Sequence, residues 1–183
     1  MSYLTSFVNA SKLYGVAGLG IMTGVSIAAS INTMPALLES NLPADKLVEV
    51  WYNLTKEGNI IATPLTLSTM GALFFVAYQR YTHPSLLHIT TLSSYIHISE
   101  GVQLGISGAL LIGVGLYTRI LMTPKTIHRL RERKKTIDVA KRRGLEPHVE
   151  AHGVKTDLHH WSTLSRFRSG MYATALLLVV TSF

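Results

Sequence analysis

The sequence predicts an all-α fold: a transmembrane four-helix bundle with an extramembrane basic amphipathic helix. Of its 183 residues, 48% are hydrophobic and only 15% are charged, whereas soluble domains carry about 25% charged residues. The apolar residues gather into four long stretches, and a membrane-crossing helix needs about 20 such residues. The formal charge of +7 is confined to residues 125–143, which hold nine basic and two acidic residues.

The four apolar stretches are the predicted membrane spans, and they form a single membrane domain over residues 1–183. The first two carry no charge, the third carries Arg119 near its end, and the fourth needs Arg166 and Arg168 at its entrance to reach full length. Loops rich in Lys and Arg stay on the cytoplasmic side, so we expect the 123–160 loop in the cytosol and both termini across the membrane. The spans cover about 14–38, 60–78, 101–122 and 161–183.

Composition also excludes several classes of protein. The chain has no cysteine, which excludes a disulfide scaffold and thiolate metal sites. Its apolar content excludes intrinsic disorder, and a single block of basic charge in an apolar chain disfavours nucleic-acid binding. The sequence leaves two membranes open, that of the endoplasmic reticulum and the mitochondrial inner membrane. No acidic residue precedes Glu39, which permits a mitochondrial address, but Lys12 is the only basic residue there.

The loop at 39–59 predicts a short helix of its own. Asp45 suits the first turn of a helix, and Gly58 is a plausible left-handed cap that would end it. An apolar face at helical spacing is expected from Leu47, Val50, Trp51 and Leu54.

Small residues recur every four positions on two of the spans, and such stripes let helices approach closely in lipid. We expect these stripes to form helix contacts within the chain, with homodimerisation as the main alternative. They comprise Gly20, Gly24 and Ala28 on the first span and Gly101, Gly105, Ala109 and Gly113 on the third.

Two pairs of polar residues are candidates for chemistry. His97 and Glu100 are three residues apart, so on a helix they share a face and are candidates for proton transfer; an interfacial polar pair is the other interpretation. His148 and His152 have the spacing of metal ligands on a helix. Neighbouring Pro and Gly residues favour a solvated loop there, so no metal site is predicted.

The basic segment predicts a helix outside the membrane that binds anionic lipid headgroups, with docking on an acidic protein as the alternative. Each basic residue near such a surface contributes about 1 kcal/mol. Ile127, Leu130, Ile137 and Ala140 form its narrow apolar stripe. The predicted membrane-surface residues are Lys125, Arg129, Arg131, Arg133, Lys134, Lys135, Lys141, Arg142 and Arg143.

Four ordered blocks of sequence resemble the anthrone oxygenase family of integral membrane proteins. They read GVSIAASINTMPALL at 24–38, WYNLTKEGNIIATPL at 51–65, LMTPKTIHRL at 121–130 and WSTLSRFRSG at 161–170. The resemblance implies a four-helix membrane bundle. By position it matches Pro35, Trp51, Tyr52, Gly58, Pro64, Thr123, Trp161, and either Arg168 or Arg166.

The resemblance further implies a monooxygenase that oxidises a polyketide anthrone to an anthraquinone with molecular oxygen and without an organic cofactor. Trp51, Tyr52, Trp161 and Arg166 are then the expected substrate-binding residues. Arg168 would stabilise the substrate anion, with His97 or Glu100 as the base. The competing hypothesis is a non-catalytic accessory subunit or assembly factor of a larger membrane protein complex.

Overall fold

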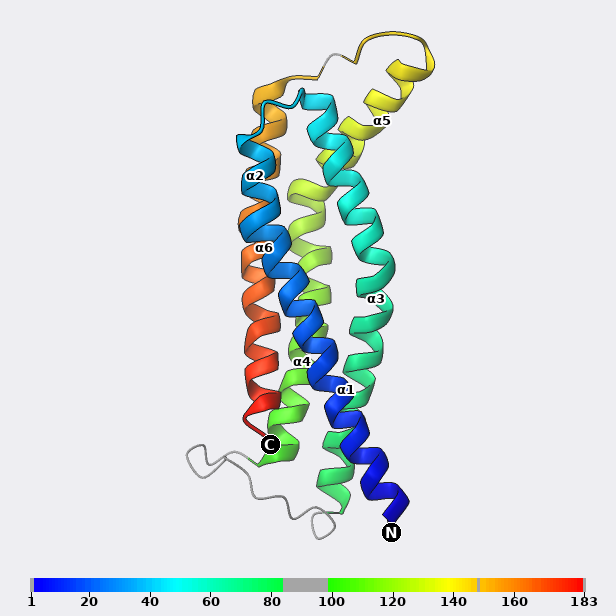
Figure 1. Ribbon diagram of the computed structural model, residues 1–183, viewed down its shortest axis with the longest axis vertical. Helices are drawn as coiled ribbons and strands as arrows, with labels where there is room; N and C mark the ends of the chain where they lie inside the picture. Colours follow the sequence, from blue (N-terminus) through cyan, green and yellow to red (C-terminus); the bar gives the residue numbers. More distant parts are fainter. Residues whose placement is uncertain (1, 84–98, 148, 183) are drawn as a thin grey trace. The chain divides into compact units, whose positions relative to one another are not determined.

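The computed structural model describes residues 2–83, 99–147 and 149–182, and every regular element within these ranges is a helix. Figure 1 shows the helices coloured along the chain. In order they are α1 (Ser2–Ile27), η1 (Ala28–Thr33), α2 (Met34–Glu39), α3 (Ala44–Thr82), α4 (Glu100–Tyr117), η4 (Thr118–Ile127), α5 (His128–Arg142) and α6 (Ala151–Val180), with η denoting a π-helical segment.

Three helical stretches in the described part of the chain are long and apolar enough to cross a membrane: Tyr3–Glu39, Ala44–Thr82 and Glu100–Arg142. They contain the first three predicted spans, which are therefore confirmed as long apolar helices. Residues 161–180 of the predicted fourth span lie in α6. This helix is not among the three stretches that are long and apolar enough to cross a membrane. The fourth membrane crossing thus stays a prediction.

The helices are divided between two compact units. Unit 1 comprises Met1–Gly24, Ala62–Gly115 and Gly170–Phe183, and unit 2 comprises Val25–Ile61 and Leu116–Ser169. Because α1, α3, α4 and α6 each contribute one part to either unit, both units are built from segments that are distant in sequence.

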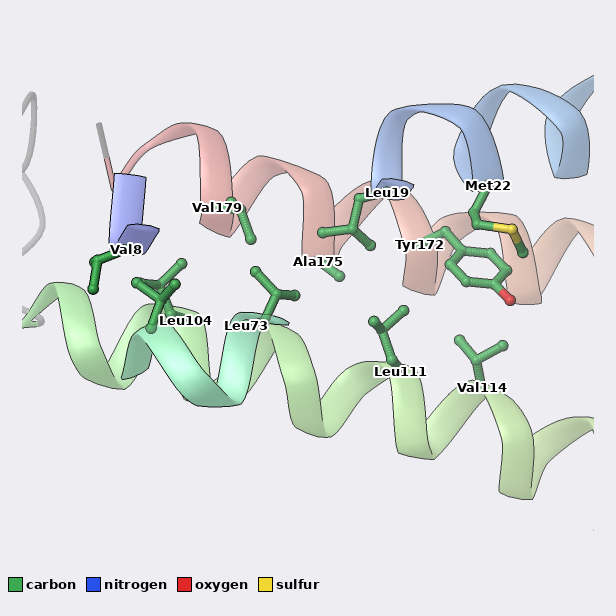
Figure 2. Close-up of a cluster of buried hydrophobic side chains, with 11 residues drawn as sticks. Val8, Leu19, Met22, Leu73, Leu104, Leu111, Val114, Tyr172, Ala175 and Val179 are labelled. Atoms are coloured by element: carbon green, nitrogen blue, oxygen red, sulfur yellow. The ribbon is translucent and has the colours of Figure 1, made fainter. Parts of the chain in front are cut away.

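Unit 1 has an apolar core to which α1, α3, α4 and α6 all contribute. Figure 2 shows Leu104 next to Val8, Leu73 on the side toward Ala175, and Leu111 and Val114 facing Tyr172. These side chains are almost completely buried. Where these helices lie in lipid, close packing of such side chains, and not their removal from water, favours helix association. The core comprises Val8, Leu19, Met22, Leu73, Val76, Leu104, Leu111, Val114, Tyr172, Ala175 and Val179.

Unit 2 has its own apolar core, and α5 is part of it. Leu130 and Ile137 of the predicted amphipathic stripe are fully buried there. The apolar stripe of the basic helix therefore packs against protein. The core comprises Met34, Leu37, Leu47, Val48, Trp51, Met122, Leu130, Ile137, Val154, Leu158 and Trp161.

Each of the two π-helical segments contains or precedes a proline. Pro124 lies inside η4, and Pro35 lies in the first turn after η1. Proline has no N–H to donate to the preceding turn, which loosens the regular hydrogen-bond ladder. In each segment a threonine hydroxyl donates to the carbonyl five residues earlier: that of Thr33 to Ala28 (3.1 Å), and that of Thr123 to Thr118 (3.0 Å).

The expected helix end at Gly58 is wrong, because α3 runs without interruption from Ala44 to Thr82. Gly58 has no positive φ; among the described residues only Gly144 does, at φ 69°. Gly144 ends α5 with two backbone bonds, from Leu145 N–H to the Ala140 carbonyl (3.0 Å) and from Gly144 N–H to the Lys141 carbonyl (3.1 Å). This pair is the Schellman motif, which favours glycine.

The expected helix contact through Gly20 and Gly24 is also wrong. A Cβ atom built on either glycine has no neighbour within 4 Å in the described part of the chain. The close approach between α1 and α3 involves a different face of α1, which carries Gly15 and Gly18. A Cβ on Gly18 would lie 2.0 Å from Thr69 Oγ1, and one on Gly15 would lie 2.7 Å from Leu73. On α4, Gly113 does approach Met171 (3.1 Å).

We therefore expect Gly18→Ala to destabilise the protein by about 1–3 kcal/mol, because the added methyl group overpacks the contact with buried Thr69. Gly20→Ala is the matched control, and it should be neutral or stabilising by up to about 1 kcal/mol through helix propensity. Thermal unfolding in detergent measures both. Equal stability of the two variants would contradict the assigned α1–α3 contact.

Candidate functional site

The two tryptophans of the chain come together in the core of unit 2. Trp51 lies on α3 and Trp161 on α6; their rings meet edge to face, with centroids 6.3 Å apart and planes at 86°. Both side chains are buried, at 1% and 3% exposure. The indole N–H of Trp51 has no acceptor among the described residues. Since buried donors are normally hydrogen-bonded, this group is available to a bound oxygen atom.

The local sequence explains how each tryptophan reaches the core. On α6, Val154, Leu158 and Trp161 are spaced at i, i+4 and i+7, which is one helix face. On α3, the buried face is Leu47, Val48 and Trp51. The expected contribution of Val50 is wrong, because its side chain is 41% exposed.

The structure separates the two candidate arginines. Arg166 is exposed, whereas Arg168 is half-buried. The Arg168 guanidinium donates to the hydroxyl of Ser165 on the same helix (3.0 Å). Only Arg168 is thus directed along the packed side of α6. A further polar group of unit 2, the Tyr117 hydroxyl, donates to the carbonyl of Leu164 one turn away from Arg168 (3.1 Å).

A seam of buried serines, which the sequence analysis missed, joins α1 and η1 to α6 within unit 2. The Ser26 and Ser169 hydroxyls are 2.7 Å apart, and the Ser162 hydroxyl donates to the carbonyl of Ser30 (2.9 Å). Ser165, which receives the Arg168 bond, is also fully buried. The spacing of Ser162, Ser165 and Ser169 on one helix face is the signal that could have revealed this seam.

Tyr52 lies beside the tryptophan pair on α3 and packs partly against the same core. The ammonium group of Lys134 from α5 is 5.7 Å from the centroid of its ring. This is within the range of a cation–π contact. The predicted substrate-binding residue Tyr52 therefore contacts a residue that was predicted to bind lipid.

Five of the nine predicted membrane-surface residues form ion pairs within unit 2. Asp157 of α6 is 3.0 Å from Arg133 and 3.8 Å from Arg129. Glu49 of α3 is 2.6 Å from Lys141 and 3.8 Å from Lys134. Lys135 pairs with Glu132 on its own helix (2.8 Å). The residues left for the predicted contact with anionic headgroups are exposed and form no ion pair with a described residue; they are Lys125, Arg131, Arg142 and Arg143.

The two predicted bases are not in this cluster. His97 lies outside the described residues. Glu100 belongs to unit 1, where its carboxylate accepts from Lys12 (2.7 Å) and pairs with Arg80 (2.9 Å). Its charge is thus held by two cations. The described ranges hold no group of three or more His, Asp or Glu side chains placed to bind a metal.

Comparisons with known proteins add no assignment. No family model, curated protein or solved structure matches the chain. The resemblance to anthrone oxygenases therefore remains a prediction from the residues quoted above.

Proposed function

We propose that the protein is an integral membrane oxygenase that binds a planar phenolic anthrone in unit 2 and oxidises it without an organic cofactor. The observation that carries this proposal is the buried indole N–H of Trp51, which has no acceptor among the described residues and lies beside the Trp161 ring. An aromatic ketone supplies the oxygen acceptor that this N–H lacks, together with a flat apolar body that can pack against aromatic rings.

The proposed reaction converts the methylene group of the anthrone and one O₂ into a carbonyl group and one water. A base removes a methylene proton, the carbanion adds O₂ to give a peroxide, and loss of hydroxide with the second proton leaves the new carbonyl. Four electrons leave the carbon and reduce O₂, so one oxygen atom enters the product and the other enters water.

Each residue has one role in this scheme. The Trp51 N–H donates to the enolate oxygen, Trp161 and Tyr52 pack against the rings, and Arg168 stabilises the negative charge as it develops. Preorganised donors and cations of this kind are the largest contributions to many enzymatic rate enhancements. His97 remains the predicted base. Glu100 is not given this role, because its carboxylate is engaged by Lys12 and Arg80 in unit 1.

Replacing Trp51 by Phe tests the proposed hydrogen bond directly. Phe retains an aromatic ring but lacks the N–H, so we expect kcat/KM for an anthrone to fall about tenfold, the equivalent of one hydrogen bond to a charged oxygen. Trp161→Phe is the matched control, because its role is packing alone. Oxygen uptake by the purified protein measures both, and equal rates for the two variants would contradict the assigned donor.

A second candidate function is that of a non-catalytic subunit of a membrane complex. It is favoured by the small-residue face of α1, where a Cβ built on Gly20 or Gly24 meets no described residue within 4 Å and Ile21 is 53% exposed. Such a face admits a partner helix at close range. Migration with a large complex in mild detergent, without oxygen uptake on anthrones, would favour this function over the oxygenase.

A further inference from the structure

We propose that unit 1 contains a second ligand site, at the side-chain amide of Gln103, that binds the neutral hydroxyl group of a lipid-dissolved molecule. Gln103 lies on α4 and is fully buried, at 0% exposure. Neither its amide nitrogen nor its amide oxygen has a hydrogen-bond partner among the described residues. The site is separate from the proposed oxygenase residues, which belong to unit 2.

An unsatisfied amide in an apolar helix bundle lowers the stability of the fold. A buried polar group that has no hydrogen-bond partner loses its hydration without replacement. Its neighbour on the same helix face shows the usual solution. The Ser107 hydroxyl donates to the carbonyl of Gln103 (2.9 Å) and lies 3.1 Å from the carbonyl of Ala175 on α6. The amide of Gln103 has no such arrangement among the described residues, and it is the group that we propose the ligand binds.

Gln103 lies three residues after Glu100 on α4, so the two residues share one face of the helix. Long side chains on a helix lean toward its N-terminus, which is the direction of Glu100 and of the polar cluster that Glu100 forms. The Glu100 carboxylate accepts from Lys12 (2.7 Å) and pairs with Arg80 (2.9 Å). Lys12 also donates to the carbonyl of Ser182, just after α6 (2.7 Å). Segments from four parts of the chain therefore meet around Lys12 and Glu100, one helical turn from Gln103.

The chemistry of this cluster defines the head group of the ligand. A carboxylic acid is disfavoured, because the Glu100 carboxylate already binds both cations and would repel a second anion. A hydroxyl group fits, since its oxygen accepts from the amide N–H and its proton is donated to the amide oxygen. A phenol and an aliphatic alcohol both provide this group.

The surroundings define the rest of the ligand. Leu104 adjoins Gln103 in sequence, and Figure 2 shows Leu104 close to Val8, with Val179 from α6 nearby. All three side chains are buried and apolar. A lipophilic body attached to the hydroxyl group is therefore compatible with this part of unit 1, whereas a sugar or a polyphosphate is not.

Thermal unfolding of the full chain in detergent tests the site with four probes: para-heptylphenol, dodecanol, para-heptylanisole and decanoic acid. We expect a saturating hydroxyl compound to raise the melting temperature by about 5 °C, with the larger of the phenol and dodecanol shifts identifying the class of hydroxyl. The anisole cannot donate a hydrogen bond and should give no shift, and decanoic acid should give none. Equal shifts with the phenol and the anisole, or no shift with either hydroxyl compound, would overturn the proposal.

Variants identify the residue responsible. Gln103→Leu removes the unsatisfied amide, so without ligand it should be at least as stable as the wild type, and it should lose the shift; Gln103→Met provides a second apolar variant. Ser107→Ala and Trp51→Phe should keep the shift. A shift that survives both Gln103 variants would overturn the site. Because the readout is melting and not oxygen uptake, the result is independent of the proposed oxygenase function.

Discussion

Replacing Glu100 by Gln is expected to destabilise the protein by about 3–5 kcal/mol, because it removes the negative partner of two buried cations. The side chains of Lys12 and Arg80 are 1% and 7% exposed, and both contact the same carboxylate oxygen of Glu100. A neutral amide does not compensate their charges. The loss should appear as a lower unfolding midpoint in denaturant or on heating.

The matched control for this variant is Glu57→Gln, since Glu57 is an exposed carboxylate on α3 and its loss should change stability by less than about 0.5 kcal/mol. Adding Lys12→Met to Glu100→Gln should recover part of the loss, because residues in one ion-pair network are not additive. A Glu100→Gln variant as stable as the control would show that the cluster is not held by this carboxylate. At temperatures where the variant is folded, its oxygenase activity should persist, unlike that of a protein that lost its base.

Replacing Arg168 by Met is expected to lower kcat/KM for an anthrone by about 10²–10³-fold, the effect of removing one preorganised stabiliser of a developing anion. Arg168 is half-buried and donates to buried Ser165 (3.0 Å), so its guanidinium is held in place before the substrate binds. Oxygen uptake at saturating and at low anthrone concentration separates the effect on kcat from that on KM.

Arg166→Met is the control for this prediction, because Arg166 is two residues away on the same helix but exposed. We expect it to retain activity within about twofold, as for surface substitutions in general. If the two arginine variants lost activity equally, or if only the Arg166 variant did, the position of the anion-stabilising group would be wrong.

The helices themselves were largely predictable from the sequence, and the reason is local. A charge-free apolar stretch such as 60–78 specifies a helix without reference to any partner, and Asp45 marks the start of α3 correctly. The prediction at Gly58 is wrong for the same reason: a glycine after a charged residue is a plausible cap, yet here the helix continues through it. Whether a helix continues through such a glycine depends on how the helix packs before and after it. The local sequence does not contain that information.

The pairing of charges was not predictable, because the partners are far apart in sequence. Lys141 binds Glu49, which is 92 residues away, and Arg133 binds Asp157 across the connection between α5 and α6. A run of basic residues therefore indicated a lipid-binding surface where most members form internal ion pairs. In the candidate site, the Trp51–Trp161 contact agrees with the predicted grouping of the two residues, whereas the choice of Arg168 over Arg166 required the orientation of α6.

Reaction of the purified protein with an anthrone under ¹⁸O₂ tests the central claim, that unit 2 supports cofactor-independent oxygenation, most directly. We predict a quinone that contains one ¹⁸O atom per molecule, formed by the wild-type protein and the Arg166 variant and strongly reduced in the Arg168 variant. A product without ¹⁸O, or labelled product formed at the same rate by the Arg168 variant and in the absence of protein, would contradict the proposed function.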